Sequence, residues 1–322
     1  MALSEFSIID EFFKLDAAYG RSPVVNIGDD CAVLDVPAGY QLAVSTDTLV
    51  DGVHFLPDSD PEFLGHKVLA VNLSDLAAGS AEPAWITVSL TIPEFDKTWL
   101  ASFNKGLTTM AEYFGIQIIG GDTCKGPLSI TVQAHGFVPE QVFCRRNTAQ
   151  AGELVCVTGT LGDAALGLLV AQGKLDVKSE EDKKFLLKRY ETPYPRMASG
   201  IALRNRATAG IDISDGLLAD VNHISQASNV GVLLRWERIP LSDAAKNVAD
   251  KPLLMKSALS GGDDYELCFS VKEDELEATQ QALEMVGSEC TAIGRLSGKP
   301  GIRVLDGKDE VEIDKLGFKH FG

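Results

Sequence analysis

The sequence predicts two domains, each a mixed α/β or α+β structure. Its length of 322 residues is more than a single typical domain needs. Strand-like and helix-like segments follow one another in both halves, and this pattern weakens between residues 143 and 152. We therefore expect a domain boundary in this stretch, which separates an N-terminal domain at 1–148 from a C-terminal domain at 149–322.

The expected elements of the first half follow from the spacing of apolar residues. Apolar residues that recur every three or four positions predict a helix, and alternation with polar residues predicts a strand. Residues 86–92 alternate most clearly, with isoleucine, valine and leucine separated by threonine and serine. In order, we expect a helix at 4–18, a strand at 41–45, a helix at 65–78, a strand at 86–92, a helix at 99–114 and strands at 116–119 and 128–138.

The second half repeats this mixture. A strand at 153–158 leads through a glycine-rich turn into a helix at 164–172. A strand at 209–213 turns at Asp215-Gly216 into a helix that reaches Ser228. Further strands are expected at 230–234, 265–271 and 291–296, and a further helix at 274–286.

Aspartate recurs beside glycine, serine or threonine, next to these strand-like runs. Such segments are expected where strands or helices end, so that the strand at 41–45 ends at Asp47 and the strand at 116–119 ends before Asp122. Carboxylates placed in this way suit Mg²⁺, which takes oxygen ligands and is usually shared with substrate phosphates. The seven segments begin at Gly28, Ser45, Asn72, Gly120, Gly162, Asp212 and Gly261.

Each segment also has a purely structural interpretation. A single Gly-Asp pair is typical of a turn, and Asp212 or Asp215 before Gly216 also fits a helix N-cap. A single histidine such as His54, or the pair Arg145 and Arg146, is compatible with an ordinary solvated position. The same pattern, an aspartate beside glycine, serine or threonine, recurs after several separate strands, and this recurrence favours the functional interpretation.

The net charge of −17 argues against nucleic acid and anionic membranes as partners. It would also repel ATP unless cations reverse the sign at the site, which favours a metal requirement. Six scattered cysteines without a C-x-x-C pair predict reduced thiols in a cytoplasmic protein. A signal peptide pattern is absent, and no apolar run approaches the ~18 residues that span a bilayer.

The motifs that are absent narrow the chemistry. The chain has no P-loop, no protein-kinase triplets and no G-x-S-x-G nucleophile elbow. Phosphoryl transfer nevertheless needs mainly positioning and charge neutralisation, which metal ions can supply. The arginine pair Arg145 and Arg146 could meet a phosphate. Candidate oxygen ligands are Asp30, Ser45, Thr46, Asp47, Asp75, Asp122, Asp212, Ser214 and Asp215.

Taken together, these segments resemble the thiamine-monophosphate kinase family, in the superfamily of aminoimidazole ribonucleotide synthetase, selenophosphate synthetase and a hydrogenase-maturation dehydratase. The resemblance runs in order along nearly the whole chain. No cysteine precedes Cys31 and the chain ends in His320-Phe321-Gly322, which separates it from the two relatives that use a reactive N-terminal Cys or a Cys-bearing tail. The matching text is I-G-D-D-C-A from Ile27, S-T-D-T-L-V-D-G-V-H-F from Ser45, N-L-S-D-L-A-A from Asn72, G-G-D-T from Gly120, G-x-L-G-D from Gly159, D-I-S-D-G-L from Asp212, S-G-G-D-D-Y-E-L from Ser260 and G-F-K-H-F from Gly317.

The resemblance implies a role for each matching position. His54, Asp263 and Phe318 are expected to face thiamine monophosphate, although the family commonly has Glu in place of Asp263 and often Trp in place of Phe318. Nucleotide contacts are expected from Gly121, Asp122, Arg146 and Ser214. Metal ligands are expected at Asp30, Ser45, Thr46, Asp47, Asp75, Asp122, Asp212 and Asp215, of which Asp30, Asp75 and Asp212 are the expected catalytic residues.

The resemblance also implies the reaction. We expect Mg²⁺-dependent, in-line transfer of the γ-phosphoryl group of ATP to thiamine monophosphate, which is the last step of thiamine diphosphate biosynthesis. The acceptor is a phosphate monoester with a second pKa of about 6, so it needs no strong general base. A homodimer with paired N-terminal sheets is expected. The alternatives are a related ATP-dependent synthetase of the same superfamily and a non-catalytic metal- or nucleotide-binding module.

Overall fold

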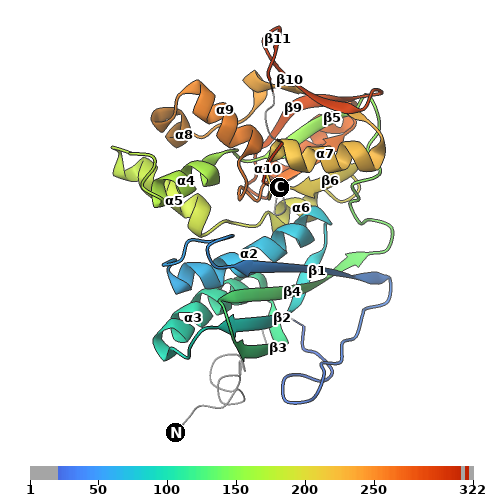
Figure 1. Cartoon of the computed structure of the whole chain (residues 1–322). Coiled ribbons are helices and arrows are strands. Elements are labelled where there is room, and N and C mark those ends of the chain that lie inside the picture. Colours follow the sequence, from blue (N-terminus) through green and yellow to red (C-terminus); the bar gives the residue numbers. More distant parts are fainter. Residues whose placement is uncertain (1–20, 313–315, 319–322) are drawn as a thin grey trace. The chain divides into compact units, whose positions relative to one another are not determined.

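The computed structural model describes residues 21–312 and 316–318 and divides into two compact units (Figure 1). The N-terminal unit contains the residues up to Leu76 together with Ala81–Gln141, and the C-terminal unit contains Ala77–Ser80 and the residues from Val142 onward. The helix expected at 4–18 lies outside the described residues. No helix in the described part of the chain is long and apolar enough to cross a membrane.

The N-terminal unit is built on a mixed four-stranded sheet. Its order is β1-β4-β2-β3, where only the β2–β3 pair is parallel. The strands are β1 (Tyr40–Val50), β2 (Glu82–Ile92), β3 (Gln117–Lys125) and β4 (Ser129–Pro139), and the helices are α2 (Pro61–Ala78) and α3 (Lys97–Phe114). Every element expected between residues 41 and 138 is therefore present, and the mixed α/β prediction is confirmed for this unit.

Two glycines allow α2 and α3 to cross closely. A Cβ atom added at Gly65 would lie 2.0 Å from the carbonyl oxygen of Phe103, and one added at Gly106 would lie 1.8 Å from that of Glu62. Both distances are far below van der Waals contact, so the helix backbones touch where any side chain would force them apart. The position of α2, which carries Asp75, depends on this crossing.

Two strand ends differ from the prediction. We expected strands to end at Asp47 and before Asp122, but β1 and β3 run through both residues. β1 keeps an unbroken antiparallel register with β4 from Tyr40 to Val50, so every residue of this stretch has a strand partner. In β3, a Cβ atom at Gly121 would lie 1.9 Å from the carbonyl oxygen of Val88, so glycine here permits close strand pairing instead of ending the strand.

The C-terminal unit contains a mixed seven-stranded sheet of order β11-β10-β7-β9-β5-β8-β6, in which the β10–β7 pair is parallel. Its strands are β5 (Leu154–Thr158), β6 (Ala209–Asp212), β7 (Gly231–Arg235), β8 (Leu267–Val271), β9 (Cys290–Ser297), β10 (Gly301–Asp306) and β11 (Asp309–Glu310). Its α-helices are α4 (Asp163–Ala171), α5 (Glu180–Glu191), α6 (Met197–Ala202), α7 (Leu217–Ser228), α8 (Asp243–Val248), α9 (Lys251–Ser260) and α10 (Leu276–Glu284).

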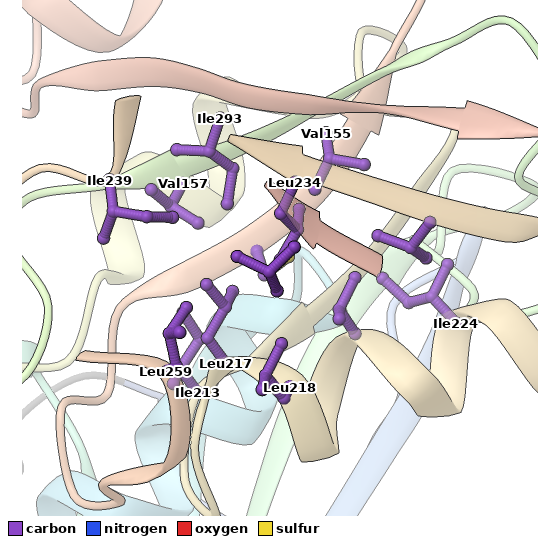
Figure 2. Packing of buried hydrophobic residues seen from close by; sticks show 14 of the residues in the cluster. Val155, Val157, Ile213, Leu217, Leu218, Ile224, Leu234, Ile239, Leu259 and Ile293 are labelled. Carbon is purple, nitrogen blue, oxygen red and sulfur yellow. The ribbon is translucent and has the colours of Figure 1, made fainter. Parts of the chain in front are cut away.

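A hydrophobic core joins α7 to this sheet (Figure 2). Leu217, Leu218 and Ile224 of the helix pack with strand residues such as Val157 and Ile293, and all of them are buried. This packing fixes the start of α7 against the end of β6, where the D-I-S-D-G-L segment lies. The seven-stranded sheet confirms the second mixed α/β domain.

Several elements of the C-terminal unit were not predicted from the sequence. They are α5, α6, α8, α9, β10 and β11. The helix α5 shows why, because only Leu186 and Tyr190 of its twelve residues are buried. One apolar pair among charged residues is too short a pattern to indicate a helix.

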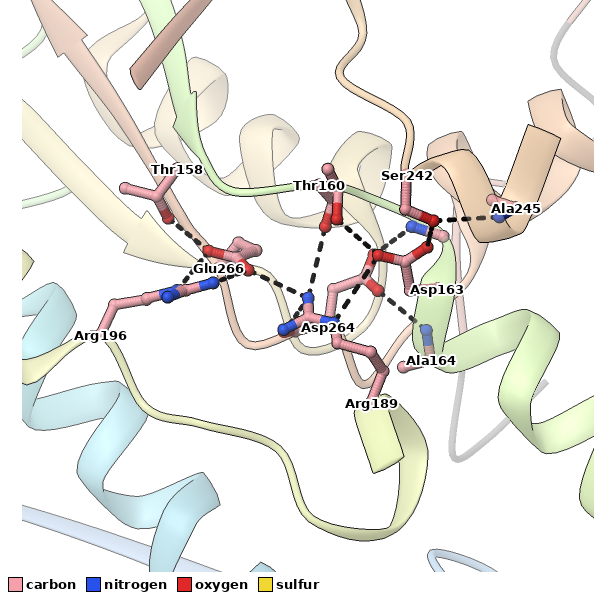
Figure 3. A network of polar contacts seen from close by, with 11 residues as sticks. Thr158, Thr160, Asp163, Ala164, Arg189, Arg196, Ser242, Ala245, Asp264 and Glu266 are labelled. Atoms are coloured by element: carbon pink, nitrogen blue, oxygen red, sulfur yellow. Dashed lines mark hydrogen bonds and ion pairs between the residues drawn. The ribbon is translucent and has the colours of Figure 1, made fainter. Parts of the chain in front are cut away.

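A network of buried charges ties the loops of the C-terminal unit together (Figure 3). Glu266, which directly precedes β8, is fully buried and accepts two hydrogen bonds of 2.6 Å from the Arg196 guanidinium. It also pairs with Arg189 of α5 at 3.0 Å. The carboxyl group of Asp264 accepts from the backbone amides of Gly162 at 2.6 Å and Ala164 at 3.2 Å, at the start of α4.

The network holds more carboxyl groups than guanidinium groups. Asp163, Asp264 and Glu266 are all buried, and the ion pairs of Asp163 and Glu266 within the described residues are made with Arg189 and Arg196. Burial raises the pKa of Glu266, but the two arginines outweigh it and hold the pKa below its ordinary value. Burial raises the pKa of Asp264 to about 8 despite Arg189. Asp264 is therefore largely protonated near neutral pH.

This protonation predicts a pH dependence of stability. The folded pKa of Asp264 lies above the ordinary 3.8, so its stabilising contribution is complete below the unfolded pKa and is lost as pH rises through about 8. We expect the free energy of unfolding to fall between about pH 5 and pH 8, by up to about 1.4 kcal/mol per pH unit for this group. Asn cannot titrate, so Asp264→Asn should show a shallower dependence. Urea unfolding of both proteins across this range checks this, and equal slopes would contradict it.

Candidate active site

Three predicted ligands of the N-terminal unit come together between β1 and α2. The Ser45 hydroxyl donates a hydrogen bond to Asp75 Oδ2, and the Asp47 backbone amide donates one to Asn72 Oδ1 at 3.1 Å. Asn72 is fully buried, and its amide nitrogen donates to the Val68 carbonyl oxygen at 3.0 Å. These bonds fix the strand against the helix, so that the Ser45 hydroxyl meets the Asp75 carboxylate and the backbone of Asp47 lies beside Asn72.

Thr46 and Asp122 lie on the opposite face of the same sheet from Ser45 and Asp47. Successive side chains alternate along a strand, and Thr46 Oγ1 accepts from Gln133 Nε2 at 3.1 Å. The strand register joins two rows across the sheet. One row is Asp47, Val132, Val88 and Gly121, and the next is Thr48, Thr131, Ser89 and Asp122.

The two acidic positions of the sheet also lie at opposite edges. Three strand-to-strand steps separate β1 from β3, which corresponds to about 14 Å at the usual spacing. Asp47 and Asp122 of one sheet are therefore not brought together in this unit.

Asp30 and His54 lie in loops of this unit. Asp30 is exposed in the loop between Val24 and Val33, whose ends are joined by a hydrogen bond of 2.7 Å from the Val24 amide to the Val33 carbonyl oxygen. His54 follows β1, and its Nδ1 accepts from the Val50 amide at 3.0 Å. In a neutral imidazole this leaves the proton on Nε2, which can donate to an anion.

In the C-terminal unit, the D-I-S-D-G segment is held by Asp220. A single oxygen, Asp220 Oδ2, accepts from the amides of Ser214 at 3.0 Å and of Asp215 and Gly216 at 3.1 Å each. Asp220 is buried in the first turn of α7. Burial, followed by the carboxylates of Asp212 and Asp215, raises its pKa to about 8 against the effect of the amide donors.

Asp263 and Phe318, the two residues of this unit that are expected to face thiamine monophosphate, bond to the carbonyl side of the same segment. The amide of Asp263 donates to Ser214 O at 2.9 Å, and the amide of Phe318 donates to Asp215 O at 3.1 Å. Glycines next to both residues permit this approach. A Cβ atom at Gly262 would lie 2.4 Å from Ser214 O, and one at Gly317 would lie 2.4 Å from Asp215 O.

The loop that carries Asp263 has an unusual backbone. Asp263 has φ 70° and Tyr265 has φ 50°, a left-handed conformation that is costly for a residue as bulky as Tyr. The Tyr265 hydroxyl donates to Asp263 Oδ1 at 3.0 Å, and the Tyr265 amide donates to Ile213 O at 2.8 Å. Asp264, between the two, belongs to the buried network of Figure 3. The network therefore holds a strained turn in place.

Arg146 lies away from Ser214. Its carbonyl oxygen accepts from Ser228 Oγ at 2.8 Å, at the end of α7, whereas Ser214 precedes the start of this helix. A helix of 12 residues is about 18 Å long. The backbones of Arg146 and Ser214 thus lie toward opposite ends of α7.

The oxygen donors fit a hard divalent cation. No group of three or more His, Cys, Asp or Glu side chains that could hold a metal ion by itself occurs among residues 21–312 and 316–318. Mg²⁺ commonly keeps several waters and is bound by one or two carboxylates plus substrate phosphates, so the Ser45, Asp47 and Asp75 oxygens suit it.

Sequence reasoning missed two residues that support the predicted ligands. Asn72 and Asp220 lie in or near the quoted motifs, but neither was predicted to receive backbone amides. The signal available for Asp220 was its position in the first turn of the helix that follows Asp215, where a carboxylate is favoured.

Family models match both halves of the chain. Residues 28–138 match "AIR synthase related protein, N-terminal domain", and residues 150–307 match "AIR synthase related protein, C-terminal domain". Escherichia coli HypE, a hydrogenase maturation protein, has the same fold, with a TM-score of 0.77 at 22% identity.

More similar proteins are thiamine-monophosphate kinases. That of Salmonella typhimurium is 45% identical over 322 residues, which cover 100% of this chain and 99% of the relative. The kinase of Stenotrophomonas maltophilia K279a has a solved structure with a TM-score of 0.83, 42% identity and coverage of 88% of this chain and 90% of that one. AaThiL complexed with AMPPCP and TMP has a TM-score of 0.78, 31% identity and coverage of 92% of both chains. The resemblance seen in the motifs is thus confirmed, and the chain belongs to the thiamine-monophosphate kinase family.

Proposed function

We propose that this chain transfers the γ-phosphoryl group of ATP, directly and in line, to thiamine monophosphate, and so catalyses the last step of thiamine diphosphate biosynthesis. Full-length identity of 45% to a thiamine-monophosphate kinase carries this proposal. The solved structure of AaThiL with AMPPCP, an analogue of ATP, and TMP supports the same pair of substrates.

Both units are proposed to contribute oxygen ligands to Mg²⁺. Those of the N-terminal unit are Asp30, Ser45, Thr46, Asp47, Asp75 and Asp122, and those of the C-terminal unit are Asp212 and Asp215. A bound Mg²⁺ would neutralise charge on the transferring phosphoryl group. The cluster of Ser45, Asp47 and Asp75 supports this assignment, because the hydrogen bonds between β1 and α2 hold these oxygens in place before any ligand arrives.

The acceptor is proposed to lie beside His54, Asp263 and Phe318. Its phosphate oxygen is largely unprotonated at neutral pH and attacks without a strong base. The His54 tautomer agrees with this, because Nε2–H can donate to the phosphate but cannot remove a proton. Asp263 and the Phe318 ring suit the cationic thiazolium. Gly121, Asp122, Arg146 and Ser214 are proposed to contact the nucleotide.

A homodimer with paired N-terminal sheets is proposed as the active form, with residues 1–148 as the domain that binds ATP and Mg²⁺ and dimerises. β1 and β3 are the edges of the described four-stranded sheet, and edge strands offer unpaired groups to a second chain. Thr46 and Asp122 lie on one face at opposite edges, so pairing of these edges would bring Asp122 of one copy toward Thr46 of the other. We also propose a cytoplasmic location, where exposed Cys31 and Cys124 stay reduced, which cell fractionation would check.

The first test concerns Asp75. With ATP and thiamine monophosphate, the protein should form thiamine diphosphate only when Mg²⁺ is present. Asp75→Asn should lower kcat by about 100-fold or more, because a ligand charge and the acceptor of the Ser45 hydroxyl are weakened together. Asp58→Asn, at an exposed position of the same unit, should leave the rate unchanged. Full turnover in excess chelator would refute the metal requirement, and a wild-type rate in Asp75→Asn would refute this ligand.

Phe318→Ala tests the acceptor pocket. We expect KM for thiamine monophosphate to rise about 3- to 30-fold, because stacking on a cation contributes ~0.5–2 kcal/mol in addition to buried area. KM for ATP should stay within about twofold, because the ring has no reason to touch the triphosphate. Phe185→Ala, which removes an exposed ring on α5, is the matched control. Equal increases in both KM values would place Phe318 outside the acceptor pocket.

The dimer is tested by charge at the sheet edge. Val44 of β1 is 52% exposed, on the same face as Thr46. Val44→Lys should shift the sedimentation coefficient from dimer to monomer and lower activity, because pairing would bury an unpaired charge. Val24→Lys, at another exposed valine of this unit, should do neither. A wild-type protein that sediments as an active monomer would exclude the dimer as the active form.

A further inference from the structure

We propose that Asp220 is a positioning residue. It sets the geometry of the predicted metal ligands Asp212 and Asp215, and also that of Asp263 and Phe318, which are predicted to contact thiamine monophosphate. The inference rests on the proposed function for the roles of these four residues. The arrangement itself is given by hydrogen bonds of the C-terminal unit alone.

One carboxyl group receives three backbone amides. Ser214, Asp215 and Gly216 are consecutive, and all three amides donate to the same oxygen of Asp220. The N-cap of α7, Gly216, makes no side-chain capping bond, so Asp220 is the side chain that accepts amides at this helix start. A side chain in the first turn of a helix leans toward the N-terminus, so Asp220 can reach back over the residues that precede α7. This differs from ordinary capping, where the capping residue precedes the amides that it receives.

The carbonyl groups of the same peptide units are also bonded. The carbonyl oxygens of Ile213, Ser214 and Asp215 accept from the amides of Tyr265, Asp263 and Phe318, respectively. Asp220 therefore holds the N–H groups of the segment, and the loops that carry Asp263, Tyr265 and Phe318 hold its C=O groups. Because a peptide unit is planar, a rotation that moves one set of groups moves the other. Loss of Asp220 would therefore shift the Asp212 and Asp215 carboxylates and also the loops that carry Asp263 and Phe318.

These hydrogen bonds are shielded from water. Asp220 is 2% exposed and Asp212 is 4% exposed, so water cannot readily replace the lost acceptor. An unpaired buried amide is costly, and the segment would have to change conformation to satisfy its amides. The backbone of Gly216, with φ 117°, is a conformation in which other residues are strained, so this turn has few alternatives.

The test compares Asp220→Ala with Asp220→Asn. Ala removes the acceptor, whereas Asn keeps an oxygen that can receive the amides. In protein free of metal and nucleotide, amide exchange at residues 214–216 should be about tenfold faster in Asp220→Ala and near wild type in Asp220→Asn. Calorimetric titration with Mg²⁺ and with thiamine monophosphate should show both affinities weakened about 10- to 100-fold in Asp220→Ala, as for loss of a residue that orients a ligand. Asp220→Asn should stay within a few-fold of wild type.

Asp250→Ala is the control, because Asp250 also accepts a backbone amide, that of Leu253 at 3.0 Å, at the start of α9. It should leave exchange at 214–216 and both affinities unchanged. Wild-type exchange in Asp220→Ala would overturn the proposal. If Asp220→Asn loses Mg²⁺ affinity while its amides exchange as in wild type, Asp220 acts through its charge and the positioning role is wrong. The Asn variant alone decides this if the Ala variant does not fold.

Faster exchange at 214–216 in Asp220→Ala with unchanged affinity for Mg²⁺ and thiamine monophosphate would also overturn the positioning role. Failure of the proposed function is recognised separately. In that case wild-type protein would not bind thiamine monophosphate at all, whereas the exchange difference between the Ala and Asn variants would persist.

Discussion

The C-terminal unit depends on buried carboxyl groups that accept backbone amides. Asp220 receives three amides before α7, and Asp264 receives two at the start of α4. Both turns are irregular, so their amides have no helix or strand partner and would otherwise remain unpaired in a dry environment. Asp220 and Asp264 stabilise the irregular backbone next to the predicted ligands, because they accept hydrogen bonds from its amides.

Charge balance sets the protonation of these groups. The chain carries an excess of acid, and its buried network has three carboxyl groups for two guanidiniums. Burying a carboxylate without a cation costs free energy. Burial therefore raises the pKa of Asp264 and that of Asp220, so that both groups are largely protonated at neutral pH. Glu266 differs from these two groups, because its two arginines hold its pKa below the ordinary value.

The N-terminal unit prepares its oxygens in a different way. Ser45 and Asp47 lie on a regular strand, and Asp75 lies on a regular helix. Their relation comes from the Ser45–Asp75 and Asp47–Asn72 hydrogen bonds and from the glycine crossing that seats α2 against α3. Regular elements hold side chains more rigidly than loops do, which suits charge neutralisation that must be in place before the reaction.

The sequence by itself determined the two mixed α/β domains, most strands, the aspartate segments and the family, because periodicity and motif text are local properties. It could not indicate that β1 and β3 continue through Asp47 and Asp122, since strand ends depend on partners far away in the sequence. The helix α5 was not predicted because only Leu186 and Tyr190 of its twelve residues are buried, and such a short apolar pattern does not indicate a helix. Only the tertiary structure decided which carboxyl groups are structural. In the sequence, Asp220 and Asp264 cannot be told apart from Asp215 and Asp263. In the structure, Asp220 and Asp264 are buried and accept backbone amides, so their role is structural. Asp215 and Asp263 are the residues proposed to contact Mg²⁺ and thiamine monophosphate.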